Sequence, residues 1–372
     1  MERLSRFYPD PVVLFTTLLL SLMGLLSIVS VKVAPHIMED LELTHLRRPL
    51  LFALFLFLGL LLMSATSYLL DYKKLNNQRV VYGMVIFSLS LLTFVLVKKV
   101  VLGKPVERWL VGTSVQPSEL SKLIIIFFIA YYVARKGSID RLRFFGWAVF
   151  VVMLHSTLLF LQPDKGMSLF VLVIAWTMLW AGGTHPRIYL PVAGLFIAFM
   201  SILFLFSGGY AHRRIAVWLS PMEDSFGSGY QIIQSLLAFM NGGLLGQGYG
   251  KGFQKLGPLT QADTDYVLAT IGEELGFPGI LFIFTLFTIL IWRLLRIANE
   301  TVDVFGKLIV FGITLNILLA VVVNVMMSIN LLPPKGIPLP FVSYGISNLM
   351  VNFLALGVVG AVQKRQLRYS LL

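Results

Sequence analysis

"PVVLFTTLLLSLMGLLSIVSVKVA", residues 11–34, carries a single charged residue, Lys32. A helix that crosses the hydrocarbon core of a bilayer needs about 20 predominantly apolar residues, so this stretch predicts a membrane-spanning helix. A cleaved signal peptide has a shorter apolar core and a small-residue cleavage site. We therefore expect the stretch to be retained as the first helix.

Nine further apolar segments follow, at 48–69, 78–98, 117–135, 144–161, 166–182, 187–207, 266–292, 303–329 and 339–362. Backbone groups in lipid must bond within their own segment, so spans of this length are helices. The chain is 57% hydrophobic and 13% charged, against about 25% charged in soluble domains. The sequence predicts one all-α integral membrane domain over residues 1–372, with about ten transmembrane helices.

Composition also excludes several kinds of chemistry. The chain has no cysteine, which excludes disulfides and thiolate sites. Its five histidines show no HExxH spacing, so no protein metal site is predicted. The net charge of +12 indicates an anionic partner. Charge alone does not decide between membrane lipid headgroups and a substrate, and no nucleic-acid partner is expected.

Basic residues indicate the orientation of the chain. They concentrate in alternate connections: Arg3 and Arg6; Lys73, Lys74 and Arg79; Arg135, Lys136, Arg141 and Arg143; Arg187; Arg293 and Arg296; and Lys364, Arg365 and Arg368. Cytoplasmic loops of membrane proteins carry such an excess, so both termini are predicted to be cytoplasmic. Segment 97–112, with four basic residues, is an exception.

The long connection 208–265, between the seventh and eighth segments, is predicted to lie outside the cytoplasm. Loops of this length are usually functional. Its stretch "SGYQIIQSLLAFMNGG" has apolar residues at helical spacing but is too short to span, which predicts an amphipathic helix on the outer face. The following "NGGLLGQGYGKGFQKLG" has a G-x-G pattern without a preceding strand or a GK[ST] sequence. We interpret it as a tight loop and not as a nucleotide site.

Four carboxylates follow this loop in "TQADTDYVLATIGEELGFPG", residues 260–279. Asp263 and Asp265 suit helix capping, but an extended chain would place them on one face, where repulsion raises one pKa. Such a carboxylate is a candidate general base, and both interpretations stay open. Glu273 is expected about 12 Å below Asp265, where it and Glu274 would form a buried ion pair or hydrogen-bond network.

Other polar residues are candidates for binding or for structure. "VQPSELSKLIII" places Glu119 and Lys122 at i,i+3, as an ion pair or an inner polar seam. Trp109 is suited to a membrane interface or a sugar ring. Three outward-facing arginines, Arg108, Arg213 and Arg214, are candidates for an anionic ligand such as pyrophosphate. Most of these groups lie at the outer boundary, which favours chemistry on a substrate held in the outer leaflet.

Together these stretches resemble the SEDS family of bacterial cell-wall proteins (shape, elongation, division and sporulation), which includes FtsW and RodA. "RWL", "QPSELSKL", "LQPDKG", "GSGYQIIQSLLAFMNGGLLGQG", "DTDYVLATIGEELGFPG" and "KGIPLPFVSYGISNLMVNF" are similar to the family's motifs and occur in the same order. The resemblance covers nearly the whole chain. "QKLG" and "IGEELG" favour the FtsW branch.

The resemblance implies a peptidoglycan glycosyltransferase of the bacterial cytoplasmic membrane that polymerises lipid II for septal or cell-shape wall synthesis. The essential Asp of the family falls on Asp265, with an implied role as general base. Arg108, Trp109, Arg213, Arg214, Lys255 and Asp263 are then expected to contact substrate. A divalent cation, Mg²⁺ or Mn²⁺, is expected to bridge the pyrophosphate, and no organic cofactor is implied. The implied partners are a class B penicillin-binding protein and membrane proteins of the divisome or elongasome.

The sequence departs from the family pattern at some positions. Asp263 stands where the family has His, so a role in tuning Asp265 or binding a cation is expected instead. Ile346 replaces a glycine, and Glu107 replaces one of two basic residues. Two other functions stay open: a lipid II flippase, for which the inner charges would line a path, and a scaffold that recruits the penicillin-binding protein. The scaffold would not need Asp265.

Overall fold

The computed structural model describes residues 9–34, 43–103, 109–110, 116–136, 142–162, 164–205, 209–224, 227 and 229–369. In these ranges the regular structure is helical: α1 (Pro11–Lys32), α2 (Leu43–Leu69), η3 (Tyr72–Leu75), α3 (Gln78–Val101), α4 (Pro117–Lys136), α5 (Leu142–Leu161), α6 (Lys165–Ala181), α7 (Pro186–Leu205), α8 (Gly209–Leu219), η4 (Pro221–Asp224), α9 (Tyr230–Gly242), η5 (Gln254–Leu256), α10 (Val267–Glu300), α11 (Val304–Ser328) and α12 (Ile346–Tyr369).

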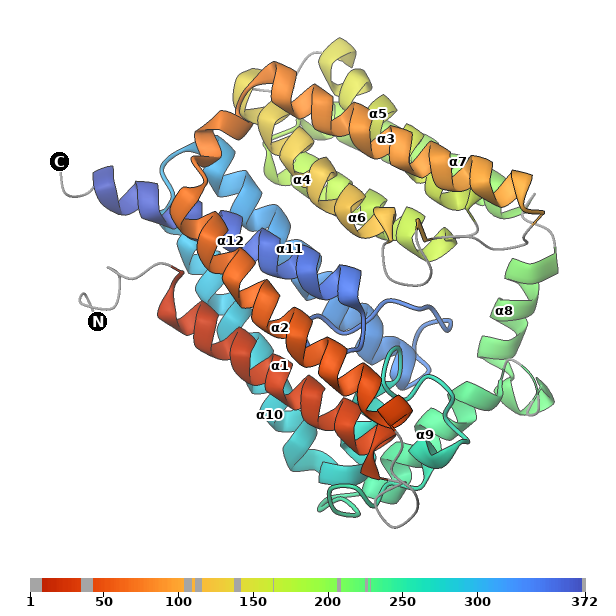
Figure 1. Ribbon diagram of the computed structural model, residues 1–372. Helices are drawn as coiled ribbons and strands as arrows, with labels where there is room; N and C mark the ends of the chain where they lie inside the picture. The colour runs from red at the N-terminus through yellow and green to blue at the C-terminus, as the bar shows by residue number, and fades with distance from the viewer. Residues whose placement is uncertain are drawn as a thin grey trace.

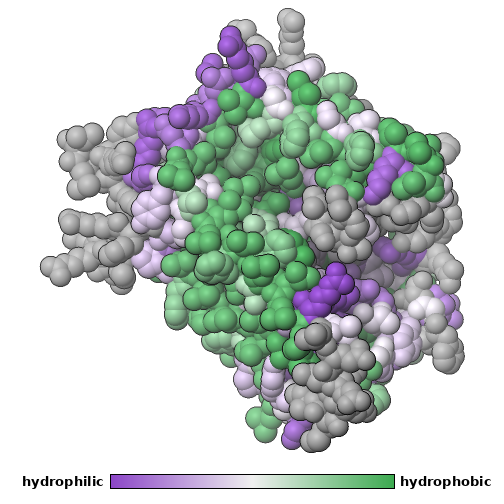
Figure 2. Space-filling view, viewed as in Figure 1, coloured by the Kyte–Doolittle hydropathy of each residue, from purple (hydrophilic) through white to green (hydrophobic). Residues whose placement is uncertain are grey.

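Each predicted apolar segment coincides with one long helix, which confirms the all-α membrane fold. Seven helices are long and apolar enough to cross a membrane, and the apolar parts of α5, α6 and α7 are shorter. Helices α8 and α9 belong to the long connection. Figure 2 shows a broad hydrophobic surface with hydrophilic groups at its ends, as expected for a bundle surrounded by lipid.

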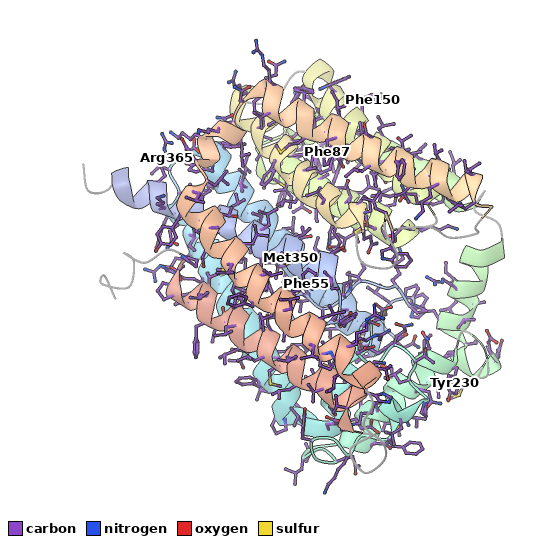
Figure 3. All side chains as sticks on the ribbon, viewed as in Figure 1. Phe55, Phe87, Phe150, Tyr230, Met350 and Arg365 are labelled. Carbon is purple, nitrogen blue, oxygen red and sulfur yellow. The ribbon has the colours of Figure 1, made fainter. Side chains whose placement is uncertain are left out.

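The helices form two groups that meet at α4 and α11. Helices α1, α2, α10 and α12 pack together on one side, and α3, α5 and α6 pack with α4 on the other (Figure 1). Helix α2 lies along α12, with Phe55 and Met350 marking the contact (Figure 3). The Phe353 ring covers Gly59, where an added Cβ would lie 2.2 Å from it. Small residues of this kind let membrane helices approach closely.

The described ends of the chain lie together at one end of the bundle. Asp10 caps α1 by accepting from Val12 N, and its other carboxylate oxygen accepts from Arg293 at 2.7 Å and Gln363 at 2.8 Å. Arg365 lies at this end and Tyr230 of α9 at the opposite end (Figure 3). If this end faces the cytoplasm, as the basic residues predict, α8 and α9 lie outside.

Helix α10 contains a kink that the sequence did not reveal. Gly276 has φ 62° and ψ −155°, a conformation open to glycine, and Pro278 has no N–H with which to bond Glu274. The freed carbonyls of Glu273 and Glu274 accept from Gln247 N and Gly248 N, both at 2.9 Å. The glycine-rich loop therefore completes the backbone bonding of the kink.

The kink changes the expected depth of Glu273 and Glu274. The part of α10 after it is by itself long enough to cross the hydrocarbon core, and the part before it packs against the outer loop. Glu273 accepts from Phe253 N at 3.1 Å, Gln254 N at 3.1 Å and Asn241 at 3.2 Å. Both residues are buried in a bonding network, as predicted, but their partners belong to the outer loop and α1, not to the middle of the bundle.

The last helix starts later than predicted, at Ile346 instead of residue 339. The segment before it, "LLPPKGIPLPF" at 331–341, contains four prolines, which lack the N–H that a helix needs. Phe341 adopts φ 65° there. This segment, residues 331–345, crosses the end of the bundle opposite the described chain ends (Figure 1) and forms one wall of the site described next.

Candidate functional site

Asp265 lies in the turn that leads into α10, at the end of the bundle that carries α8 and α9 (Figure 1). Its carboxylate faces the 331–345 segment: a Cβ added at Gly336 would lie 3.0 Å from Oδ2 of Asp265. A side chain at position 336 would require the Asp265 carboxylate to shift by a few tenths of an ångström. The Asp265 side chain is partly exposed, which suits a group that must exchange a proton with a substrate.

The backbone around Asp265 is held at three consecutive carbonyls. The carbonyl of Asp263 accepts from Tyr344 N at 2.8 Å and that of Thr264 accepts from Ser343 Oγ at 2.6 Å. Asn324 Nδ2 donates to the Asp265 carbonyl at 3.0 Å and also to the Ile337 carbonyl at 3.0 Å. The "DTD" stretch is therefore fixed to α11 and the 331–345 segment.

Cations from three elements gather beside this segment. Arg214 of α8 donates to the Pro334 carbonyl at 3.1 Å. The Lys335 side chain extends over the start of α6, where a Cβ added at Gly166 would lie 2.6 Å from its Nζ. The positive charges of Arg214 and Lys165 are close enough to repel each other. Such a grouping favours an anionic ligand.

The hydroxyl of Tyr266 is influenced by the charges of both Asp265 and Arg214. Burial raises the pKa of its hydroxyl, the charge of Asp265 raises it further, and Arg214 acts in the opposite direction. Asp265 and Arg214 therefore both lie within electrostatic reach of one buried phenol. Asp265 and Arg214 also both contact the 331–345 segment, at Gly336 and at the Pro334 carbonyl. The candidate base and an arginine that could bind an anion therefore belong to one site.

Asp263 is placed differently from the extended arrangement that would put it beside Asp265. Residues 260–265 form turns, so Asp263 and Asp265 do not share the face of an extended strand. The Asp263 side chain is 1% exposed, and Oδ2 lies 2.6 Å from Arg48 Nη1 and 3.7 Å from Lys32 Nζ. Its carboxylate faces α1 and α2 and is closed off from a substrate or a cation in this structure.

Lys255 also differs from its predicted role. Its side chain is 0% exposed and forms an ion pair with Glu274. Its Nζ also donates to Ser30 Oγ at 2.5 Å. The lysine thus fixes the outer loop between α1 and α10, and its buried ammonium does not face a substrate.

The remaining predicted binding residues are only partly described. The Trp109 carbonyl accepts from Lys98 Nζ at 3.1 Å, and the residue is partly buried at the end of α3. Arg108 lies outside the described residues. Arg213 belongs to the backbone of α8, and its side chain lies outside the described part.

Three of the motifs meet beside the site. Gln116 donates its N–H to Ser347 Oγ at 3.0 Å and its side-chain amide to Asp164 Oδ2 at 3.2 Å. "QPSE", "LQPD" and "SYGIS" are therefore joined by one residue. This junction holds the start of α6, and with it Lys165, next to the 331–345 segment.

The predicted pair of Glu119 and Lys122 is present and buried, with 2.9 Å between the charged atoms. Asn348 also donates to Glu119 at 2.8 Å, and Asn352 bonds to Asn348 at 3.0 Å. The charges of this polar seam are satisfied by one another and by the amides of α12. This bonding favours a structural role over a path for a transported molecule.

The predicted divalent cation would need a set of carboxylate or imidazole ligands. The described residues contain no group of three or more His, Asp or Glu that could hold a metal ion, and Asp263 faces Arg48. The described part of the site therefore does not provide a protein ligand set. A cation bound to a pyrophosphate remains a prediction.

Several residues of the site were not predicted. Asn324 lies in an apolar helix and Arg48 at the start of α2, and neither is marked by a motif. Lys335 and Lys165 were visible as basic residues of outer connections. Only the crossing of the 331–345 segment brings them together.

Known proteins share this architecture. The family of cell cycle proteins FtsW, RodA and SpoVE matches residues 11–368. The chain belongs to this family. The match confirms the family predicted from the motifs.

Individual FtsW/RodA/SpoVE proteins extend the comparison. A relative from Geobacter metallireducens, named probable peptidoglycan glycosyltransferase FtsW, is 40% identical over 269 residues, which cover 71% of each chain. A second with this name, from a Geobacter species, is 36% identical and covers 96% of this chain and 97% of its own. These relatives confirm the preference for the FtsW branch.

A solved structure of a peptidoglycan synthase complex contains a chain with a TM-score of 0.75 to this protein at 25% identity. It covers 95% of this chain and 97% of its own, in a study of how a peptidoglycan synthase complex coordinates polymerisation and crosslinking. The likeness supports the fold over nearly the full length of this chain.

Proposed function

We propose that this chain is a peptidoglycan glycosyltransferase that polymerises lipid II at the outer face of the bacterial cytoplasmic membrane, with Asp265 as general base. The observation that carries the proposal is the position of Asp265, a partly exposed carboxylate on a rigid backbone beside a group of cations. The family and the names of its relatives support the reaction class.

The reaction needs a base and a site for the leaving group. Asp265 removes the proton from the 4-hydroxyl of the acceptor sugar. The resulting oxygen attacks the anomeric carbon of the lipid-linked donor, a new glycosidic bond forms, and the bond to undecaprenyl pyrophosphate breaks. Arg214, with Lys335 and Lys165, is positioned to hold the negative charge of the leaving pyrophosphate.

Glycan strands must also be crosslinked through their peptides, which needs a transpeptidase. The chain contains no soluble domain for peptide crosslinking in its described part. The related solved complex couples polymerisation with crosslinking, so we propose a class B penicillin-binding protein as partner. The orientation with both termini cytoplasmic rests on the basic residues of the connections.

The test is glycan polymer formation from purified lipid II with the partner transpeptidase present. Asp265→Asn is expected to lower kcat by about 100-fold or more, since general bases contribute about 10²–10⁴-fold. Glu223→Gln removes an exposed carboxylate from the same outer connection and is expected to retain wild-type activity. Equal polymer from wild type and Asp265→Asn would contradict the assignment. Lipid II transport without polymer would favour a flippase.

A further inference from the structure

Asp263 and Arg48 form an ion pair that the proposed reaction does not use. Arg48 Nη1 lies 2.6 Å from Asp263 Oδ2, and Lys32 Nζ lies 3.7 Å from the same oxygen. The carboxylate is 1% exposed, whereas the Arg48 side chain is 47% exposed. A buried carboxylate two residues from Asp265 therefore depends on a cation from the start of α2.

Arg48 also contacts Tyr344, one of the residues that fix the backbone of the "DTD" stretch. Its guanidinium lies over the Tyr344 ring, 5.3 Å from the centroid. Tyr344 N in turn donates to the Asp263 carbonyl at 2.8 Å. One turn further along α2, Phe52 lies 6.5 Å from the same ring. Arg48, Asp263 and Tyr344 thus form a closed set of contacts.

The contacts of Asp263 are transmitted to Asp265 through a short, rigid backbone. The carbonyls of Asp263, Thr264 and Asp265 are each fixed by a hydrogen bond. The Asp263 ion pair lies only two residues from Asp265 in this bonded turn, so its loss acts on the backbone that carries the Asp265 carboxylate. A displacement of about 1 Å in a catalytic group costs about 100-fold in rate.

From these contacts we infer that Arg48 is a positioning residue, which holds Asp265 in its catalytic position through the ion pair with Asp263. The inference rests on the proposed function, in which Asp265 is the base. It assigns the first two membrane helices a direct part in catalysis. It also gives Asp263 a different role from ligand binding.

The loss of Arg48 is expected to lower the unfolding temperature only in part, because Lys32, 3.7 Å from the same oxygen, remains as a cation beside the buried Asp263 carboxylate. Its effect on turnover is larger, because the buried Asp263 carboxylate loses its main partner and moves toward other cations or water. The expected signature is a lower kcat at an unchanged KM for lipid II.

The experiment measures kcat and KM for lipid II polymerisation by the full-length chain with its partner. Arg48→Gln and Asp263→Asn are each expected to lower kcat by about 10–100-fold, with KM within about twofold of wild type. Arg48→Lys retains the charge and is expected to restore most of the kcat. The double variant is expected to be no worse than the poorer single variant, because coupled residues are not additive.

Arg47→Gln is the matched control, since it removes the same charge one position away on an exposed part of α2. It is expected to keep wild-type kcat. Unfolding temperatures of all variants separate lost folding from lost positioning. Wild-type kcat in Arg48→Gln, multiplicative losses in the double variant, or a change confined to KM would each overturn the inference. Absence of polymer from the wild type would instead overturn the proposed function.

Discussion

The sequence predicted the candidate role of Asp265 but not the surroundings of Asp263. The sequence predicted Asp265 as the base because the "DTD" stretch resembles a family motif. It did not predict that the neighbouring carboxylate faces the opposite way, because the partner of Asp263 is Arg48, more than two hundred positions earlier. The chemistry of a residue was therefore easier to predict than its partner.

The role of Lys255 as the buried partner of Glu274 can be tested by substitution. Lys255→Met is expected to destabilise the protein by about 3–5 kcal/mol, because it leaves Glu274 buried without its cation. Lys255→Met combined with Glu274→Met is expected to recover much of that loss. Unfolding temperature in detergent measures both. If Lys255 bound substrate instead, the single variant would raise KM without a change in unfolding temperature.

Among the elements, the kinked α10 and the glycine loop depend on each other. The number and order of the long helices followed from the apolar segments. The kink did not, because a Gly-Phe-Pro sequence inside an apolar run also fits a straight helix with a weak point. The kink depends on the glycine loop, because Gln247 N and Gly248 N donate to carbonyls that residues of a straight helix would otherwise bond.

Gly246 tests this dependence. It has φ 76°, and a Cβ added there would lie 2.3 Å from the Glu274 carbonyl. Gly246→Ala is expected to cost about 1–3 kcal/mol through its backbone conformation alone and to separate the loop from α10. Protease digestion of the outer loop measures the separation. Gly83→Ala in α3 is the control, because its Cβ has open space. Equal protease resistance of the two variants would contradict the proposed packing.

For the whole molecule, Asp10 joins α1 to α10 and α12. Burial raises the pKa of its carboxyl, but the hydrogen bonds from Arg293 and Gln363 outweigh this effect and bring the pKa below the usual 3.8. A lowered pKa in the folded state stabilises the protein above pH 3.8, and this contribution is lost as the pH falls through the lowered value.

Asp10→Asn is therefore expected to destabilise the protein at neutral pH by about 3 kcal/mol. The difference from wild type should narrow as the pH falls below 3.8. Unfolding temperatures of the two proteins between neutral and acidic pH measure the effect. Glu300→Gln, in the exposed pair with Arg296, serves as control and is expected to show little difference. A difference for Asp10→Asn that stays constant with pH would contradict the assignment.

The hydrogen bonds that fix the backbone at residues 263–265 can form only after their partners have been synthesised. The ribosome makes Asp265 before Asn324, Ser343 and Tyr344, the residues that hold its backbone. At about 5–20 residues per second, Tyr344 follows roughly 4–16 s after Asp265. A nascent chain in which the helices before Asn324 have been made still lacks the hydrogen bonds that fix Asp265, the proposed base. The geometry of the proposed site is therefore completed only after the 331–345 segment has been made.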